Sequence, residues 1–164
     1  MTLVSQSIGA NKPERAEEIG WSSVFFTTTL CIIIGIAVWI FRIQLLDLYD
    51  PPAEVKVFSI PLFLFIAFYQ VFDALQVTAA FILRAYRIAF LPMVIYAGSL
   101  WGVGLGGGYL MGFNVFGNTP AFLQGANGFW AGNSLSLGLA ACFLLYLFRR
   151  TAERYEKTHP SVET

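Results

Sequence analysis

One acidic residue, Asp73, lies in the middle of a long apolar stretch of this 164-residue chain. An aspartate at the centre of a membrane span costs about 2.5–3.5 kcal/mol, and such residues usually have a function. At 100° per residue, Tyr69, Gln76 and Ala80 fall on the same helix face as Asp73, and Gln70 flanks that face. Carboxylate, phenol and amide oxygens are the ligands that hard cations prefer. The stripe therefore predicts a cavity wall that holds a small cation; the alternative is an aspartate that is protonated, or paired with a neighbouring helix for packing.

Aromatic residues beside this stripe are candidates for holding an organic cation by attraction to the ring face, helped by Asp73. Phe65, Tyr69 and Phe72 have the best position for this role. For most of the other aromatic residues we expect lipid-facing bulk or an interfacial belt. The sequence has no nucleophile–base pair and no cluster of metal-ligating His and Cys residues, so we expect neither enzymatic activity nor a cofactor.

Composition indicates the solvent in which these elements fold. Hydrophobic residues make up 57% of the chain and charged residues only 12%, against about 25% charged residues in soluble domains. From Ile88 to Phe148, 61 consecutive residues contain no Asp, Glu, Lys or Arg. The net charge of zero argues against a nucleic-acid partner. The chain is therefore predicted to be an integral membrane protein whose partner is the lipid bilayer.

Charge placement divides the chain into four apolar spans, and each is longer than the roughly 20 residues that cross a hydrocarbon core. Helices are expected because an open strand would leave its backbone groups unpaired in lipid. The predicted fold is thus an all-α membrane protein with four transmembrane helices. The predicted spans are about 19–41, 57–83, 88–113 and 128–148, with a segment 1–18 before them and a polar tail 149–164 after them.

Basic residues near the span ends predict the orientation. One side carries eight of them, and the other side carries Arg42 and Lys56 only. The eight are Lys12, Arg15, Arg84, Arg87, Arg149, Arg150, Arg154 and Lys157. We therefore expect a multi-pass protein of the inner (plasma) membrane with both termini in the cytoplasm.

Small residues recur at every fourth position in the third and fourth spans. These positions are Gly98, Gly102 and Gly106; Gly104, Gly108 and Gly112; and Gly128, Gly132, Ser136 and Ala140. Small residues let helices approach closely in a membrane, where packing replaces the hydrophobic drive. All three series are predicted to be packing ridges, and contact between the third and fourth spans is one arrangement that they would allow.

Several segments, read in order, resemble the last third of a transporter of the MATE (multidrug and toxic compound extrusion) family, in its NorM-like branch. The resemblance covers residues 2–150 and is carried by Val4–Ala10, Pro13–Ala16, Phe68–Val77, Ile82–Tyr86 with Pro92, and Gly125–Gly132. The turn at residues 85–89 departs from the family because it lacks the usual Gly-x-Gly-Asp-Thr-like residues. The acidic residue on the family's seventh helix has no counterpart here either.

The resemblance implies twelve helices in two six-helix lobes, of which this chain would supply the ninth to the twelfth and a stub of the eighth. Asp73 and Tyr69 match the positions of the family's sodium site, so they would be sodium ligands if sodium is the coupling ion; a proton is the alternative. The complete protein would export cationic drug-like compounds. This chain alone is expected to be inactive, and to need the missing N-terminal helices or a complementary chain.

Two other functions remain open from the sequence. One is a small four-helix membrane protein that dimerises, or pairs with a partner, without transport. The other is a flippase of the same superfamily. A flippase would be expected to have a basic cavity, whereas the stripe here carries a single acid.

Overall fold

The computed structural model describes residues 1–159, and every regular element in this part is a helix. The elements are α1 (Thr2–Gly9), α2 (Pro13–Ile40), α3 (Arg42–Leu48), α4 (Ala53–Ala85), α5 (Phe90–Gly98), η1 (Ser99–Gly107), α6 (Gly108–Gly112), η2 (Ala121–Leu123) and α7 (Ala126–Thr158). Four stretches are long and apolar enough to cross a membrane, which confirms the predicted fold class. Residues 160–164 of the predicted tail lie outside the described residues.

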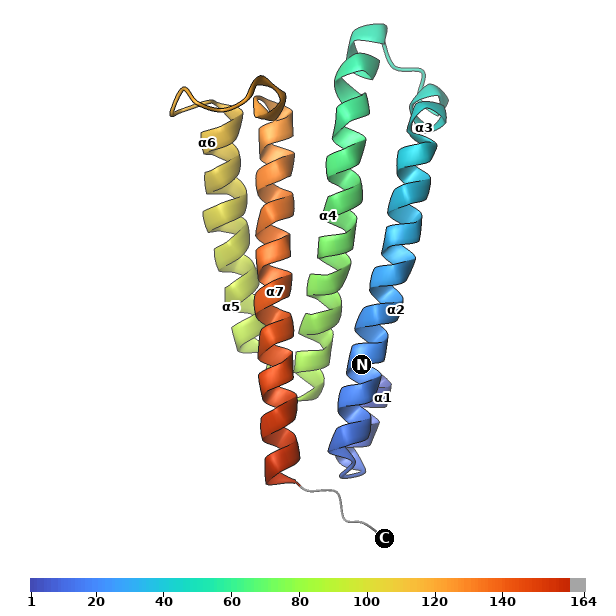
Figure 1. The fold of residues 1–164 in the computed structure, drawn as a ribbon, viewed down its shortest axis with the longest axis vertical. Helices are drawn as coiled ribbons and strands as arrows, with labels where there is room; N and C mark the ends of the chain where they lie inside the picture. Colours follow the sequence, from blue (N-terminus) through green and yellow to red (C-terminus); the bar gives the residue numbers. More distant parts are fainter. Residues whose placement is uncertain (160–164) are drawn as a thin grey trace.

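The four long stretches run along one axis (Figure 1). They are α2, α4, the continuous rod of α5, η1 and α6, and α7. We call the end that holds the start of α2 and the ends of α4 and α7 the terminal end. The opposite end, which holds α3 and the connection between α6 and α7, is the loop end.

Three of the helices, α2, α4 and α7, are longer than the predicted spans, and α4 extends its span by four residues at the start and two at the end. α2 begins at Pro13, whose fixed φ and missing N–H suit the first helical turn, and Glu14 follows it. α7 continues ten residues beyond Phe148, to Thr158. Charged residues do not stop a helix that leaves the hydrocarbon, because its backbone hydrogen bonds form equally well in the headgroup region and in water.

The turn at residues 85–89 closes although it lacks the family's glycines. Arg87 adopts φ +64°, a left-handed conformation that favours glycine, and the Ile88 N–H donates to the Leu83 carbonyl at 3.0 Å. The departure in sequence therefore leaves a capped helix end, with an arginine in the position that usually suits glycine.

The main hydrophobic core lies at the terminal end and joins α1, α2, α4 and α7. Phe148 of α7 is fully buried, and its ring contacts Gly20 of α2 so closely that a Cβ at Gly20 would lie 2.5 Å from it. The rings of Trp21 and Tyr86 pack on the same phenylalanine, at centroid distances of 5.3 and 6.1 Å. This aromatic cluster fixes how the three longest helices meet.

The third and fourth spans pack against each other through glycines, and only one of the two ridges on the third span takes part. Gly108 and Gly112 lie against α7, where a Cβ on Gly132 would come within 2.6 Å of the Gly108 nitrogen and one on Gly128 within 2.7 Å of the Gly112 nitrogen. Gly104 belongs to the same ridge and faces Ser136.

The series Gly98, Gly102 and Gly106 makes no such contact within the described chain. A Cβ on Gly98 or Gly102 would meet nothing within 4 Å, and one on Gly106 would meet only the Trp101 carbonyl of the same rod. Two series offset by two residues point to different sides of a helix, and α7 covers one side only.

The third span is also less regular than its sequence suggested. Its middle, Ser99–Gly107, is a nine-residue π-helix between two α-helical segments. π-Helical turns are rare and occur frequently at functional sites. This one lies beside α7 and borders the aromatic cavity described below.

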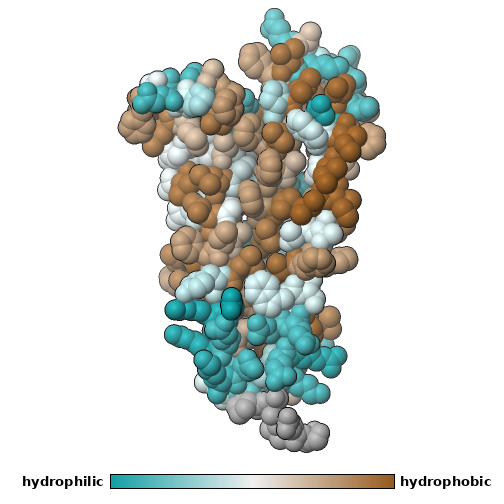
Figure 2. Space-filling view, in the orientation of Figure 1, coloured by the Kyte–Doolittle hydropathy of each residue, from teal (hydrophilic) through white to brown (hydrophobic). Residues whose placement is uncertain are grey.

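The outer surface is apolar in the middle of the bundle. Figure 2 shows mostly brown and white side chains there and teal ones at the two ends, most densely at the terminal end. Large side chains such as Phe25 (75% exposed) and Trp101 (71% exposed) point outward. Such a surface is typical of a chain that is surrounded by lipid.

Candidate functional site

Helix α4 places Asp73 close to the middle of the bilayer. Arg84 marks the terminal end of this helix, and Asp73 precedes it by 11 positions, which correspond to a rise of about 16 Å. Half the thickness of a hydrocarbon core is about 15 Å. Asp73 is partly buried, and its carboxylate makes no hydrogen bond or ion pair within the described part of the chain.

Tyr69 lies one helical turn from Asp73 and joins it to two other helices. Its ring meets the ring of Trp130 on α7 edge to face, with centroids 5.7 Å apart. It is also within electrostatic range of both Asp73 and Tyr96, and Tyr96 is on α5. Residues of α4, α5 and α7 are therefore brought together around Tyr69. The polar stripe in the sequence had indicated only the residues of α4.

Among the other candidate residues of the stripe, Phe72 and Phe65 contact α7. Gln76 is buried, with 6% of its surface exposed. The Phe72 ring lies 3.6 Å from the point where a Cβ on Gly138 would be, and the Phe65 carbonyl accepts a hydrogen bond from the Ser134 hydroxyl at 3.4 Å. In this chain Phe65 and Phe72 thus help to pack α4 against α7. Gln70 is partly buried.

An aromatic cavity of about 280 Å³ lies on the other side of Trp130. Trp101 and Leu100 of η1 line one wall, and Phe129, Trp130 and Asn133 of α7 line the other. Aromatic faces with a single amide suit a flat organic cation better than a metal ion. Trp130 therefore contacts both this cavity and Tyr69 of the Asp73 site.

Sequence reasoning did not select Trp130, Asn133 or Tyr96. Trp130 is near the start of its span, where an interfacial tryptophan is the ordinary expectation. The signal available in the sequence was Asn133, an amide well inside an apolar span. In the structure Asn133 faces Gly104 of η1, and its Oδ1 lies 3.3 Å from the point where a Cβ on Gly104 would be. No spacing rule connects Tyr69 with Trp130, because the contact depends on how α4 and α7 are rotated.

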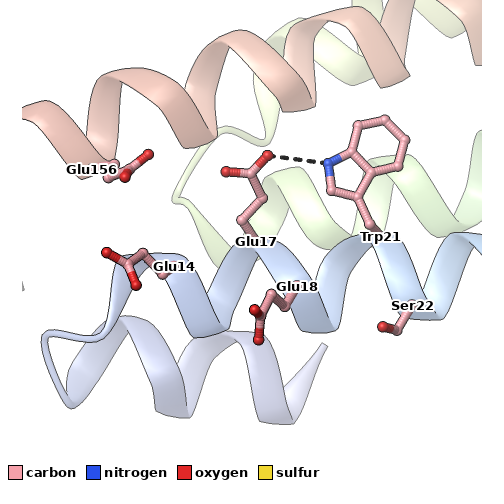
Figure 3. Close-up of a pocket in the computed structure, with 6 residues that line it drawn as sticks. All are labelled: Glu14, Glu17, Glu18, Trp21, Ser22 and Glu156. Carbon is pink, nitrogen blue, oxygen red and sulfur yellow. Dashed lines mark hydrogen bonds between the residues drawn. The ribbon is translucent and has the colours of Figure 1, made fainter.

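A second, more polar pocket opens at the terminal end between α2 and α7 (Figure 3). It has a volume of about 610 Å³ and is lined by four glutamates, Glu14, Glu17, Glu18 and Glu156, with Trp21 and Ser22. The Trp21 Nε1–H donates a hydrogen bond of 3.2 Å to the Glu17 carboxylate. No group of three or more acidic, His or Cys side chains in residues 1–159 has the arrangement of a metal site. We therefore describe this pocket as an acidic surface.

Tyr86 lies just beyond the end of α4, within electrostatic range of Glu17. Burial, the Glu17 carboxylate and Tyr155 raise the pKa of Tyr86 to about 12. Its hydroxyl is buried and has no hydrogen-bond partner in the described residues. The phenol is therefore neutral at physiological pH, and its ring serves to pack against Phe148 and Tyr155.

Comparison with known proteins agrees with the resemblance inferred from the residues. The sequence profile of the MatE family matches residues 1–110. NorM of Aromatoleum aromaticum, described as a probable multidrug resistance protein, is 32% identical over 154 residues, which are 94% of this chain and 33% of that protein. The corresponding NorM of Shewanella oneidensis is 37% identical over 123 residues, 75% of this chain and 26% of that protein.

The multidrug resistance protein PmpM of Pseudomonas aeruginosa is 29% identical over 160 residues, which cover 98% of this chain and 33% of PmpM. This chain therefore spans about a third of the length of the curated relatives that it matches. No solved structure was found to match it.

Proposed function

Because this chain belongs to the MatE family and is a multi-pass membrane protein, we propose that it forms part of a multidrug efflux antiporter. The complete protein would export cationic organic compounds in exchange for sodium ions or protons. In this proposal Asp73 is the coupling carboxylate and Tyr69 supplies a second oxygen, which would also be a sodium ligand if sodium is the coupling ion. The proposal also places the protein in the inner membrane, with both termini in the cytoplasm.

One observation carries the proposal: a carboxylate near mid-membrane that is partly buried and unpaired within the described residues. A carboxylate needed only for packing would be expected to accept a hydrogen bond or an ion pair from the neighbouring helix, since an unpaired charge in lipid is costly. Asp73 instead lies beside Tyr69 and near the aromatic cavity that Trp130 shares. This arrangement supports exchange of a small cation for an organic one at adjacent positions.

We expect the chain to require further helices for transport. Alternating access depends on two halves that rock about a site between them. The chain matches about a third of the length of its relatives, and at Tyr69 of the Asp73 stripe it supplies neighbours from α5 and α7. The missing N-terminal helices, or a complementary chain, would provide the opposite wall.

The proposal is tested in a chimera in which residues 2–150 replace the matching third of the Pseudomonas aeruginosa PmpM protein. Efflux of a fluorescent organic cation is measured in cells that lack other drug pumps. Asp73→Asn keeps the side-chain volume but removes the exchangeable charge, so efflux is expected to fall to the level of cells without the chimera. Tyr69→Phe is expected to be milder, because it removes one oxygen and leaves the charge.

Asp50→Asn is the matched control. Asp50 lies in the loop end at φ +44°, a conformation that asparagine adopts as readily as aspartate, so this variant should transport normally. Unchanged efflux in Asp73→Asn at normal membrane level would leave Asp73 with a packing role only.

The same experiment separates the alternative functions. If the intact chimera reaches the membrane and moves no cation, a four-helix membrane protein without transport becomes the better description. If the purified chain alone moves the dye in liposomes, and does so with a sodium or proton gradient, it is a self-assembling small transporter.

A further inference from the structure

A groove of about 450 Å³ lies at the terminal end, on the side of α7 that faces the start of α5. It plays no part in the Asp73 site. From α7 it receives Leu147, Thr151, Arg154 and Thr158, which are spaced by four, three and four residues and so share one helix face. Arg150 borders the same face. The groove therefore runs lengthwise along the end of α7.

The groove changes from apolar to cationic along its length. Leu147 forms its membrane-side end together with Ile88, from the turn before α5, and Leu91, from the first turn of α5. Arg150 and Arg154 follow at one and two turns beyond Leu147. A ligand that filled it would need a hydrocarbon part and an anionic part, side by side in that order.

The depth of the groove matches the boundary of the bilayer. The uncharged stretch of the chain ends at Phe148, and at 1.5 Å per residue Arg150 and Arg154 lie about 3 and 9 Å further along the helix axis. The headgroup layer on each side of a hydrocarbon core is about 5–8 Å thick. Arg150 is therefore within the headgroup layer and Arg154 at its outer edge, where the long arginine side chain can still reach lipid phosphates. The terminal end of the bundle is correspondingly hydrophilic (Figure 2).

The two arginines have no carboxylate partner in the described part of the chain. Arg150 lies over the Tyr146 ring at 5.1 Å, while the neighbouring Arg149 pairs with Glu153 at 3.1 Å. Four of the five glutamates described at this end, all except Glu153, gather instead in the pocket between α2 and α7, which shares no residue with the groove (Figure 3). One end of the bundle thus has an acidic side and a basic side, and only the basic side would attract an anion.

We propose that this groove binds an anionic phospholipid, whose phosphate is held by Arg150 and Arg154 while an acyl chain lies against Ile88, Leu91 and Leu147. Arginine forks hydrogen-bond phosphate oxygens well, and basic pockets between transmembrane helices select lipids of this charge. The site is independent of drug transport, so it stands whether or not Asp73 couples efflux.

The test uses the purified chain in neutral detergent and measures lipid retention by native mass spectrometry during titration with dioleoyl phosphatidylglycerol or dioleoyl phosphatidylcholine. The chain is expected to bind phosphatidylglycerol in preference to phosphatidylcholine. Arg150→Gln combined with Arg154→Gln should weaken phosphatidylglycerol binding about thirtyfold, because each arginine near the surface contributes to the attraction. Binding of phosphatidylcholine should not change.

Arg149→Gln combined with Lys157→Gln is the matched control, since it removes the same net charge from α7 but neither residue lines the groove. It should retain most of the preference. Equal losses in the two double variants would show diffuse surface attraction and overturn the proposal, and so would equal binding of the two lipids.

Two further outcomes would assign the groove to another occupant and also overturn the proposal. In the first, inorganic phosphate raises the thermal stability of the chain as much as phosphatidylglycerol does, and the effect depends on Arg150 and Arg154. This result would indicate a site for free anions. The other is an oligomer of the chain that disappears in Arg150→Gln/Arg154→Gln without a change in lipid binding, which would indicate contact with the acidic side of a second copy.

Discussion

Asp73, Tyr69 and Trp130 differ in what each could give a bound cation. Asp73 supplies the only full charge and Tyr69 a phenol oxygen, whereas Trp130 supplies a ring face that borders the 280 Å³ cavity. Tryptophan has the strongest attraction for cations among the aromatic side chains. The edge-to-face contact with Tyr69 also means that a change at Trp130 reaches the Asp73 side of α4.

Trp130→Leu in the chimera is expected to weaken the binding of tetraphenylphosphonium by roughly tenfold, as a desolvated cation–π contact contributes about 1–2 kcal/mol. Equilibrium dialysis with the purified chimera measures this affinity. Trp39→Leu is the control, because Trp39 lies near the loop end of α2 under the Arg42 guanidinium, away from the cavity. Equal affinity in the parent and Trp130→Leu proteins would remove Trp130 from the binding site.

At the scale of the elements, the contact between the third span and α7 depends on backbone approach. Gly108, Gly112, Gly128 and Gly132 bring the two helices so close that side chains have no room between them. Such close approach compensates for the absence of a hydrophobic drive between helices in lipid. It also holds η1 beside α7, which shapes the aromatic cavity.

Gly132→Ala is expected to destabilise this contact by about 1–3 kcal/mol, because the new Cβ would lie 2.6 Å from a backbone nitrogen that cannot move away by rotation. Thermal unfolding of the chain in detergent, followed by circular dichroism, measures the effect. Gly102→Ala makes the same chemical change where nothing lies within 4 Å, so it should be neutral or slightly stabilising. Equal stability of the two variants would contradict the described packing.

At the scale of the whole molecule, both ends of the membrane-spanning region and the basic turn at residues 84–87 lie at the same end of the bundle (Figure 1). That end carries eight of the ten Lys and Arg residues, and the loop end carries Arg42 and Lys56. Since lysine and arginine are retained on the cytoplasmic side, this distribution predicts that the terminal end is cytoplasmic.

The orientation is tested with single cysteines in a background in which Cys31 and Cys142 are alanine. In intact cells, a membrane-impermeant maleimide is expected to label cysteines at Ser59 and Asn118, near the loop end, and to leave one at Thr158 unlabelled. Labelling at all three positions after the cells are opened is the control for accessibility. Labelling of Thr158 alone in intact cells would reverse the orientation.

The amino-acid sequence by itself determined the four spans and pointed to Asp73. Because lipid excludes charged side chains, a 61-residue stretch without them indicates that these residues lie in a membrane. For the same reason, a single acid inside a span is conspicuous. Both signals are local, because each depends on a residue and its surroundings rather than on a particular partner. The approximate limits of the spans follow from the same rule, although α2, α4 and α7 extend beyond them.

Only the tertiary structure decided which residues meet. The series beginning at Gly98 and at Gly104 have the same spacing. The Gly104 series lies against α7, whereas the Gly98 series meets no other helix of the described chain. Likewise, neither the Tyr69–Trp130 contact nor the separation of acidic and basic sides at the terminal end can be read from helix periodicity. Periodicity identifies the residues that share a face, whereas the rotation of each helix about its axis, which packing against its neighbours sets, decides what that face touches.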